Sequence, residues 1–299
     1  ETNPFAAGLQ PLPDWFELTR SDYQEHGPTP LGDIRGRRAV SQYYKDAFSV
    51  AIDPDDIILT ASTSEAYLAL FHVFADRDQE VATFVPGYPL LDELAEDSGI
   101  DVLKIPLDRV DERWVIDGRR TFEAICDRTR ALVLVRPNHP TGTVAQLDEV
   151  LLLGELELPL IVDEVFVDTS RTKTVLSEPD FTESTHLKII LGGIAKTLLL
   201  PNWKLSWMVL CGGADQKAEL KHRLEHLLDR TLSLATPISL ALSRWFACVP
   251  PVQGRLSERL TINEARLRAL TSPHEHLVVP PRDGGWHISI RWEDSQRRY

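Results

Sequence analysis

A chain of 299 residues, 43% of them hydrophobic, is long enough to bury a large core and is not a disordered segment. Its 45 Asp and Glu residues outnumber its 32 Lys and Arg residues, which gives a formal net charge of −13. Such a surface repels nucleic-acid phosphates and anionic lipids, so we expect neither as a partner. No apolar run approaches the roughly 20 residues that a membrane helix needs, and we expect no membrane span.

The cysteines are few and lack paired spacing. Cys126, Cys211 and Cys248 form no CxxC pattern, so the sequence predicts neither a disulfide framework nor a zinc knuckle. No cluster of His, Cys and carboxylate residues has the spacing of metal ligands, and we predict no catalytic metal. The polar start Glu1–Asn3 is not that of a signal peptide, and with the cysteine usage it favours a cytoplasmic location.

The order of elements along the chain predicts an α/β fold. Residues 1–30 are rich in proline and predict an extended arm. From about residue 33, amphipathic stretches alternate with short runs of Val, Ile and Leu, which is typical of a sheet covered by helices on both faces. Strands are predicted at Ile57–Thr60, Glu80–Val85, Asp101–Ile105, Ala131–Val135, Leu158–Asp163, Lys188–Leu191 and Trp207–Cys211. Helices are predicted at Ile34–Phe48, Ser64–Ala75, Leu90–Ser98, Thr121–Asp127, Leu147–Leu153 and Ala214 to about Ser233.

The pattern changes after Pro250. A helix at Arg255–Leu270 and a short strand pair at His276–Val279 and His287–Trp292 predict the start of a smaller α+β domain. We therefore expect an N-terminal arm (1–30), a large domain (31–213), and a linking helix with a partial, apparently truncated small C-terminal domain (214–299).

Three polar clusters follow predicted strands, where open α/β sheets place their ligands. The first holds three consecutive hydroxyl residues, Ser62, Thr63 and Ser64, between a strand and a helix. Hydroxyl groups and free backbone N–H groups at a helix start suit a phosphate. An ordinary helix N-cap is the alternative reading of the same residues.

The second and third clusters carry the charged groups. Asp163 and Glu164 close an apolar strand, and a buried carboxylate there must meet a cation, a metal or a hydrogen-bond donor. A structural salt bridge and a catalytic role both satisfy that need. Lys196 follows the next strand in a turn of small residues, but Ile190 and Ala195 stand where a P-loop requires glycine.

Taken in order, these segments resemble the class I/II aminotransferases, the fold-type I pyridoxal-phosphate enzymes, and the resemblance covers nearly the whole chain. The start of the chain is similar to the histidinol-phosphate aminotransferase branch. The matching segments are Glu1–Phe5 (E-N-P), Gly32–Ala39 (G-x-x-x-L-R-x-A), Pro86–Pro89 (P-x-Y-P), Arg136–Gly142 (N-P-x-N-P-T-G), Asp163–Phe166 (D-E-x-Y) and Ala195–Trp207 (S-K-x-x-x-x-P-G-x-R-x-G-W).

The resemblance implies a mostly parallel seven-stranded sheet, the cofactor pyridoxal 5'-phosphate and a role for each motif residue. Lys196 would hold the cofactor as a Schiff base and move the substrate proton, since the cofactor acts only when bound to an amine. Asp163 would pair with the ring nitrogen, and Tyr88 would stack on the ring. The remaining residues implied to bind the cofactor are Ser62, Thr63, Ser64 and Lys204 at the phosphate, Asn138, His139 and Phe166 near the ring, and Tyr23 from across a dimer.

Several positions depart from the family pattern. His139 replaces an asparagine and Phe166 replaces a tyrosine, so both usual donors to the ring oxygen are altered. Lys204 replaces an arginine that grips the phosphate with two hydrogen bonds. The tyrosine that reaches across the dimer corresponds to Tyr23, or His26 takes its place. The segment that carries the arginine for the substrate carboxylate has no counterpart before Tyr299.

The resemblance therefore implies a homodimeric enzyme of amino-acid metabolism or biosynthesis that moves an amino group from an amino acid to a 2-oxo acid. Fold alone does not select the reaction. A decarboxylase, a lyase, or an oxidase or cyclase of a biosynthetic pathway remains the alternative within the same chemistry. A non-catalytic regulatory protein with this fold is the alternative of a different class.

Overall fold

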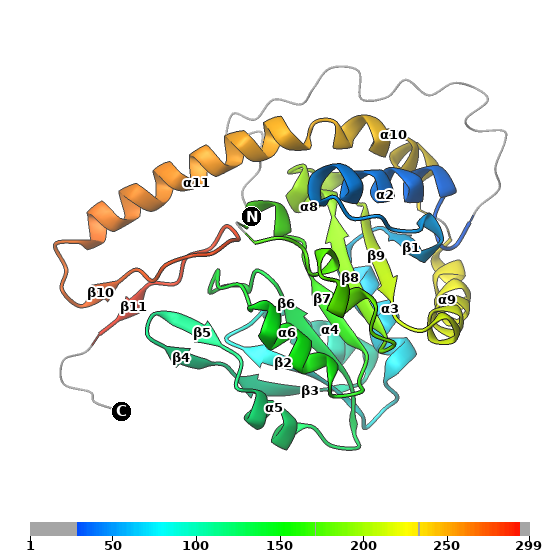
Figure 1. Cartoon of the computed structure of the whole chain (residues 1–299), viewed down its shortest axis with the longest axis horizontal. Coiled ribbons are helices and arrows are strands. Elements are labelled where there is room, and N and C mark those ends of the chain that lie inside the picture. The colour runs from blue at the N-terminus through cyan, green and yellow to red at the C-terminus, as the bar shows by residue number, and fades with distance from the viewer. Residues whose placement is uncertain (1–28, 171, 233, 294–299) are drawn as a thin grey trace.

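The computed structural model describes residues 29–170, 172–232 and 234–293. Within them, a seven-stranded sheet has the strand order β1-β9-β8-β7-β6-β2-β3 (Figure 1). All of its strands are parallel except β9, which is antiparallel to both neighbours. The strands are β1 (Ile57–Thr60), β2 (Glu80–Val85), β3 (Asp101–Pro106), β6 (Thr129–Val135), β7 (Leu160–Asp163), β8 (Lys188–Gly193) and β9 (Ser206–Cys211).

The central strands are apolar throughout because helices cover both faces of the sheet. Side chains alternate between the faces, so Leu132 and Leu134 enter one core while Val133, between them, enters the other. One face packs against α2 (Ile34–Phe48), α6 (Leu147–Gly154) and α10 (Thr236–Phe246). The other packs against α3 (Thr63–Phe74), α4 (Leu90–Ser98) and α9 (Ala214–Leu228).

All seven predicted sheet strands are confirmed, each within two residues at either end. The predicted helices are present too, with α5 (Gly118–Ala124) beginning earlier than expected and α9 ending earlier. Short α7 (Pro179–Thr182) and α8 (Ile194–Thr197) were not predicted, nor was α10. The hairpin of β4 (Asp108–Val110) and β5 (Arg113–Val115) was also missed, because its turn lacks glycine and places Asp111 at a φ of 54°.

The C-terminal predictions need correction. The helix α11 spans Val249–Thr271 and so starts before the predicted Arg255, with prolines in its first turn, where no backbone N–H is required. The strand pair is shorter than expected, β10 (Leu277–Val278) with β11 (Arg291–Trp292), so His287 lies outside a strand. From the far end of α11 the chain runs back toward the sheet (Figure 1). The division into domains stays a proposal.

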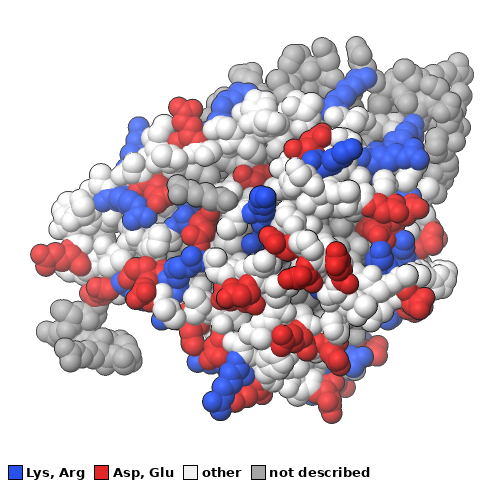
Figure 2. Space-filling model, in the orientation of Figure 1, with Lys and Arg blue, Asp and Glu red and all other residues white. Residues whose placement is uncertain are grey.

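Among the described helices, none is both long and apolar enough to cross a membrane. On the face shown in Figure 2, Lys and Arg side chains are interspersed with Asp and Glu side chains. The described residues contain no cluster of three or more His, Cys, Asp or Glu side chains that could hold a metal ion.

Candidate active site

The polar clusters meet at one edge of the sheet. Strands β6, β7 and β8 are parallel neighbours, so the turn 136–142, Asp163 and Lys196 all lie at their carboxyl ends. Strand β1 runs parallel to β8, because both are antiparallel to β9, and so Ser62 follows at the same edge. Ligands bind at this edge in open α/β sheets.

Lys196 lies on α8 under two aromatic rings. Its Nζ atom lies 4.7 Å from the ring centroid of Trp286 and 5.5 Å from that of Phe166. The two rings also contact each other edge to face, with 5.4 Å between centroids. Trp286 comes from the segment between β10 and β11, about ninety residues further along the chain, and the sequence offered no periodic signal that would place it here.

Asp163 is buried, with 4% of its surface exposed. The Tyr67 hydroxyl donates to its Oδ2 atom at 2.8 Å, and the Val165 backbone N–H donates to its Oδ1 atom at 3.1 Å. Burial raises the pKa of Asp163, while these hydrogen bonds and the nearby Lys196 ammonium oppose the rise. The carboxylate thus meets the donors that its burial requires.

The sequence motifs do not single out Tyr67, which the structure places at Asp163. It lies four residues after Thr63 on α3, so it is on the same helix face one turn further in. A buried tyrosine needs a partner for its hydroxyl, and that requirement was the signal available. The structure gives it Asp163 as that partner.

Glu164, the second carboxylate of the pair Asp163 and Glu164, forms a structural salt bridge. It accepts a hydrogen bond from Arg136 at 2.9 Å and from the Val175 backbone N–H at 3.0 Å, and the Thr174 hydroxyl also donates to it. Burial raises the pKa of Glu164, and the Arg136 guanidinium opposes the rise. Glu164 therefore joins β6 to the segment after β7.

His139 and His287 lie near Lys196, and Tyr88 packs against His139. The Tyr88 ring packs edge to face against the His139 ring, with 5.6 Å between their centroids. The centroids of the His139 and His287 rings are 4.2 Å apart. Burial lowers the pKa of His139, and the neighbouring His287 and Lys196 add to the effect. Burial followed by Lys196 also lowers the pKa of His287. Both imidazoles are therefore neutral at pH 7, and neither adds a positive charge beside Lys196.

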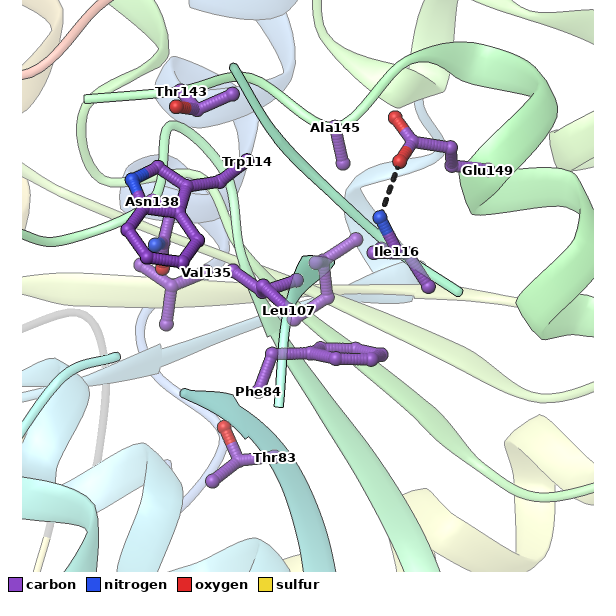
Figure 3. Close-up of a pocket in the computed structure, with 11 residues that line it drawn as sticks. Thr83, Phe84, Leu107, Trp114, Ile116, Val135, Asn138, Thr143, Ala145 and Glu149 are labelled. Carbon is purple, nitrogen blue, oxygen red and sulfur yellow. Dashed lines mark hydrogen bonds between the residues drawn. The ribbon is translucent and has the colours of Figure 1, made fainter. Parts of the chain in front are cut away.

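Asn138 stabilises the turn that follows β6. Its amide donates to the Pro86 carbonyl and to the Thr141 hydroxyl, both at 2.9 Å. It also borders a small pocket whose lining includes Trp114 of β5 and Phe84 of β2 (Figure 3). Its side chain thus links the turn after β2 to the turn after β6.

The three hydroxyl residues occupy the start of α3. Ser62 is the N-cap, since its side chain accepts a hydrogen bond from the Glu65 backbone N–H at 3.1 Å. Thr63 and Ser64 are the first two helical residues, whose N–H groups have no acceptor inside a helix. A helix of 12 residues with its first N–H groups directed outward suits an anion.

The other implied phosphate ligands are not brought to the cluster by any described contact. Lys204 is exposed, has a φ of 53°, and makes no hydrogen bond or ion pair among residues 29–170, 172–232 and 234–293. Tyr23 and its alternative His26 lie outside the described residues.

The residues around Lys196 fit pyridoxal phosphate. The His139 Nδ1 and Trp286 Nε1 atoms are buried without a hydrogen-bond partner in the described part of the chain. Unpaired buried polar atoms are costly, and a bound group with acceptor oxygens would satisfy them. Asp163 likewise is a buried carboxylate with no ion pair among the described residues, as a site for a protonated ring nitrogen requires.

Comparison with known proteins decides the family. Residues 2–275 match the family described as aminotransferase class I and II. The chain belongs to this family. Among curated members, tyrosine aminotransferase of Mus musculus is 30% identical over 231 residues, which are 75% of this chain and 50% of that protein. S-alkyl-thiohydroximate lyase of Arabidopsis thaliana is 30% identical over 229 residues, which are 73% of this chain and 48% of that protein.

Solved structures of this family have the same fold. Alanine aminotransferase from Pyrococcus furiosus superposes with a TM-score of 0.81 at 22% identity and covers 93% of this chain and 72% of its own. Tyrosine aminotransferase from Leishmania infantum gives 0.79 at 18% identity and covers 89% and 68%. These likenesses confirm the fold-type I architecture. The chain spans about half the length of the curated relatives it matches.

Proposed function

We propose that this chain forms the cofactor-binding part of a pyridoxal-phosphate-dependent aminotransferase that moves an amino group from an amino acid to a 2-oxo acid. One observation carries the proposal. Lys196 follows β8 beside Asp163, a buried carboxylate that ends the neighbouring strand β7. The family relationship and the names of its members support it.

Each site residue then has a stated task. Asp163 would hold a protonated ring nitrogen, since its carboxylate is already oriented by Tyr67 and Val165. Lys196 would attach the cofactor and carry a proton to and from the substrate carbon. Pyridoxal phosphate supplies an electron sink for the negative charge that proton removal leaves. Tyr88 would stack on the ring.

The remaining residues would enclose and orient the bound group. Phe166 and Trp286 would shield the Lys196 ammonium from water, which would strengthen charge interactions there. His139 would donate or accept through its buried Nδ1 atom. Ser62, Thr63, Ser64 and Lys204 would bind the phosphate, and Asn138 would hold the turn that bears His139.

Other reactions of the same cofactor are not favoured, because most of the named relatives are aminotransferases. We further propose a homodimer, in which Tyr23 of one protomer would reach the phosphate of the other. Three cysteines that are free in the structure support a cytoplasmic location.

Covalent attachment tests the proposal directly. The purified chain is mixed with pyridoxal phosphate, reduced with borohydride, digested and analysed by mass spectrometry. We expect a phosphopyridoxyl group on Lys196 and its absence in Lys196→Ala. The exposed Lys45→Ala variant is the matched control and should retain the label. Equal labelling of Lys196→Ala and the parent chain contradicts the proposal, and transfer to a 2-oxo acid is then assayed to separate transamination from other reactions.

A further inference from the structure

We propose that Asp168 is a positioning residue for Lys196, acting through Thr197. The inference rests on the proposed function, because it concerns the geometry of the attachment lysine. Asp168 lies on the turn after β7, five residues beyond Asp163, and Thr197 directly follows Lys196. None of the sequence motifs assigns a role to either of them.

The Asp168 carboxylate joins two distant segments. The Thr197 hydroxyl donates to its Oδ2 atom at 2.7 Å, and the Tyr43 hydroxyl of α2 donates to its Oδ1 atom at 2.8 Å. Thr197 is 2% exposed and Tyr43 is 4% exposed. Both buried hydroxyls therefore use this one carboxylate as an acceptor, and no Lys or Arg of the described residues forms an ion pair with it.

A second side chain holds the same turn through its backbone carbonyls. Gln253 of α11 donates through its Nε2 atom to the Thr197 carbonyl at 2.6 Å and to the Lys196 carbonyl at 3.2 Å. Both carbonyls lie at the end of α8, where the helix has no N–H group that could donate to them. The turn that bears Lys196 is thus held by Asp168 through the Thr197 side chain and by α11 through two backbone carbonyls.

The turn needs such support because α8 has only four residues. An isolated helix of that length is not stable on its own, since its first turn fixes several residues for one hydrogen bond. The next residues do not extend it, because Leu199 has a φ of 59°. External hydrogen bonds therefore set the direction in which the Lys196 side chain leaves the backbone.

That direction matters for attachment. Lysine has a long flexible side chain, so a small rotation of its backbone moves the Nζ atom by a large distance. Reacting groups must be held close to their productive geometry, and a displacement of about 1 Å can lower a rate by about 100-fold. Asp168 would act on the rate through this placement and without touching the substrate.

Thr197 offers a matched pair of substitutions. Thr197→Val has nearly the same shape but no hydroxyl, whereas Thr197→Ser keeps the hydroxyl. We measure the second-order rate constant of pyridoxal phosphate attachment to Lys196, kcat and KM separately, and Tm. We expect Thr197→Val and Asp168→Asn to slow attachment and lower kcat by about 10- to 100-fold with KM nearly unchanged, and Thr197→Ser to stay within about 3-fold of the parent chain.

Two further variants keep the proposal falsifiable. Gln253→Met removes the bonds to the carbonyls from the other side and should slow attachment even if Asp168→Asn does not fold. The double variant Asp168→Asn with Thr197→Val should be no slower than the worse single variant, because both substitutions act on the same Asp168–Thr197 hydrogen bond. An attachment rate equal to that of the parent chain in Thr197→Val, with only a lower Tm, overturns the proposal. Failure of the parent chain itself to attach the cofactor overturns the proposed function first, and this inference falls with it.

Discussion

Arg136 and Glu164 form a buried ion pair with 2.9 Å between Nη1 and Oε1, and their side chains are 6% and 0% exposed. The guanidinium also donates to the Ala145 and Lys173 carbonyls, each at 3.0 Å. Since both charged groups have several hydrogen-bond partners, the pair tolerates burial. It joins the ends of β6 and β7, where Asp163 is the last residue of β7 and His139 lies in the turn that follows β6.

Removal of one partner should destabilise the protein strongly. Arg136→Ala leaves the Glu164 carboxylate buried and unpaired, and we expect a loss of about 3 to 5 kcal/mol in the free energy of unfolding. Lys104→Ala is the control, because the Lys104 and Asp92 pair is about half exposed, and it should cost at most about 1 kcal/mol. Urea unfolding of each variant measures its loss in the free energy of unfolding. A similar small shift in the two variants would show that the buried pair contributes no more than a surface pair.

A second prediction concerns the glycine before the lysine turn. An added Cβ on Gly192 would lie 2.5 Å from the Trp207 ring, which is itself buried and bonded to Tyr44. We expect Gly192→Ala to destabilise the fold by about 1 to 3 kcal/mol through overpacking. Gly254 in α11 has open space around it, so Gly254→Ala should stabilise by up to about 1 kcal/mol. Thermal unfolding measures the change in stability of each variant. A Gly254→Ala variant less stable than the parent chain would contradict the prediction.

The sequence predicted the sheet strands well because each is a short apolar run whose burial on two faces leaves a local signature. Val133 and Ile161 are apolar for this reason and lie side by side in β6 and β7. The polar clusters were predicted from the same apolar runs, because each cluster directly follows one of these strands and parallel strands end at the same edge of the sheet. Asp163 and Lys196 therefore lie where the pattern placed them.

Contacts between distant segments were not predictable in this way. The approach of Trp286 to Lys196 and of Tyr43 to Asp168 depends on how loops and helices pack, and no local periodicity encodes it. The short hairpin β4–β5 escaped for a different reason, since its strands have three residues each and its turn lacks the usual glycine.

The burial of Asp163 predicts a pH effect on stability. Its folded-state pKa is raised above the ordinary 3.8, so the folded protein binds a proton more tightly than the unfolded chain. Stability is therefore lost as the pH rises from about 4 through the raised value. Asp163→Asn removes this loss, and we expect the variant without cofactor to be the more stable protein at pH 7, although it lacks the carboxylate proposed for the ring nitrogen and should be impaired in transfer assays.

The measurement is the difference in unfolding free energy between Asp163→Asn and the parent chain across pH 4 to 8, both without cofactor. Glu164 and Asp168 also have raised pKa values, but they are common to both proteins and cancel in the difference. The difference should grow with pH and then level off. A difference that does not change with pH would refute the role of burial.

The start of α3 allows the helix cap and the phosphate site to be separated. Ser62 caps the helix, so Ser62→Ala should lower the free energy of unfolding by about 1 kcal/mol, whereas Ser64→Ala, which removes no cap, should leave it nearly unchanged. If both residues bind phosphate, each substitution should weaken binding of pyridoxal phosphate by several-fold and leave binding of pyridoxal, which has no phosphate, unaltered. Equilibrium titration with the two compounds measures this. Equal weakening for both compounds would mean that the hydroxyls act on the fold and do not contact the phosphate.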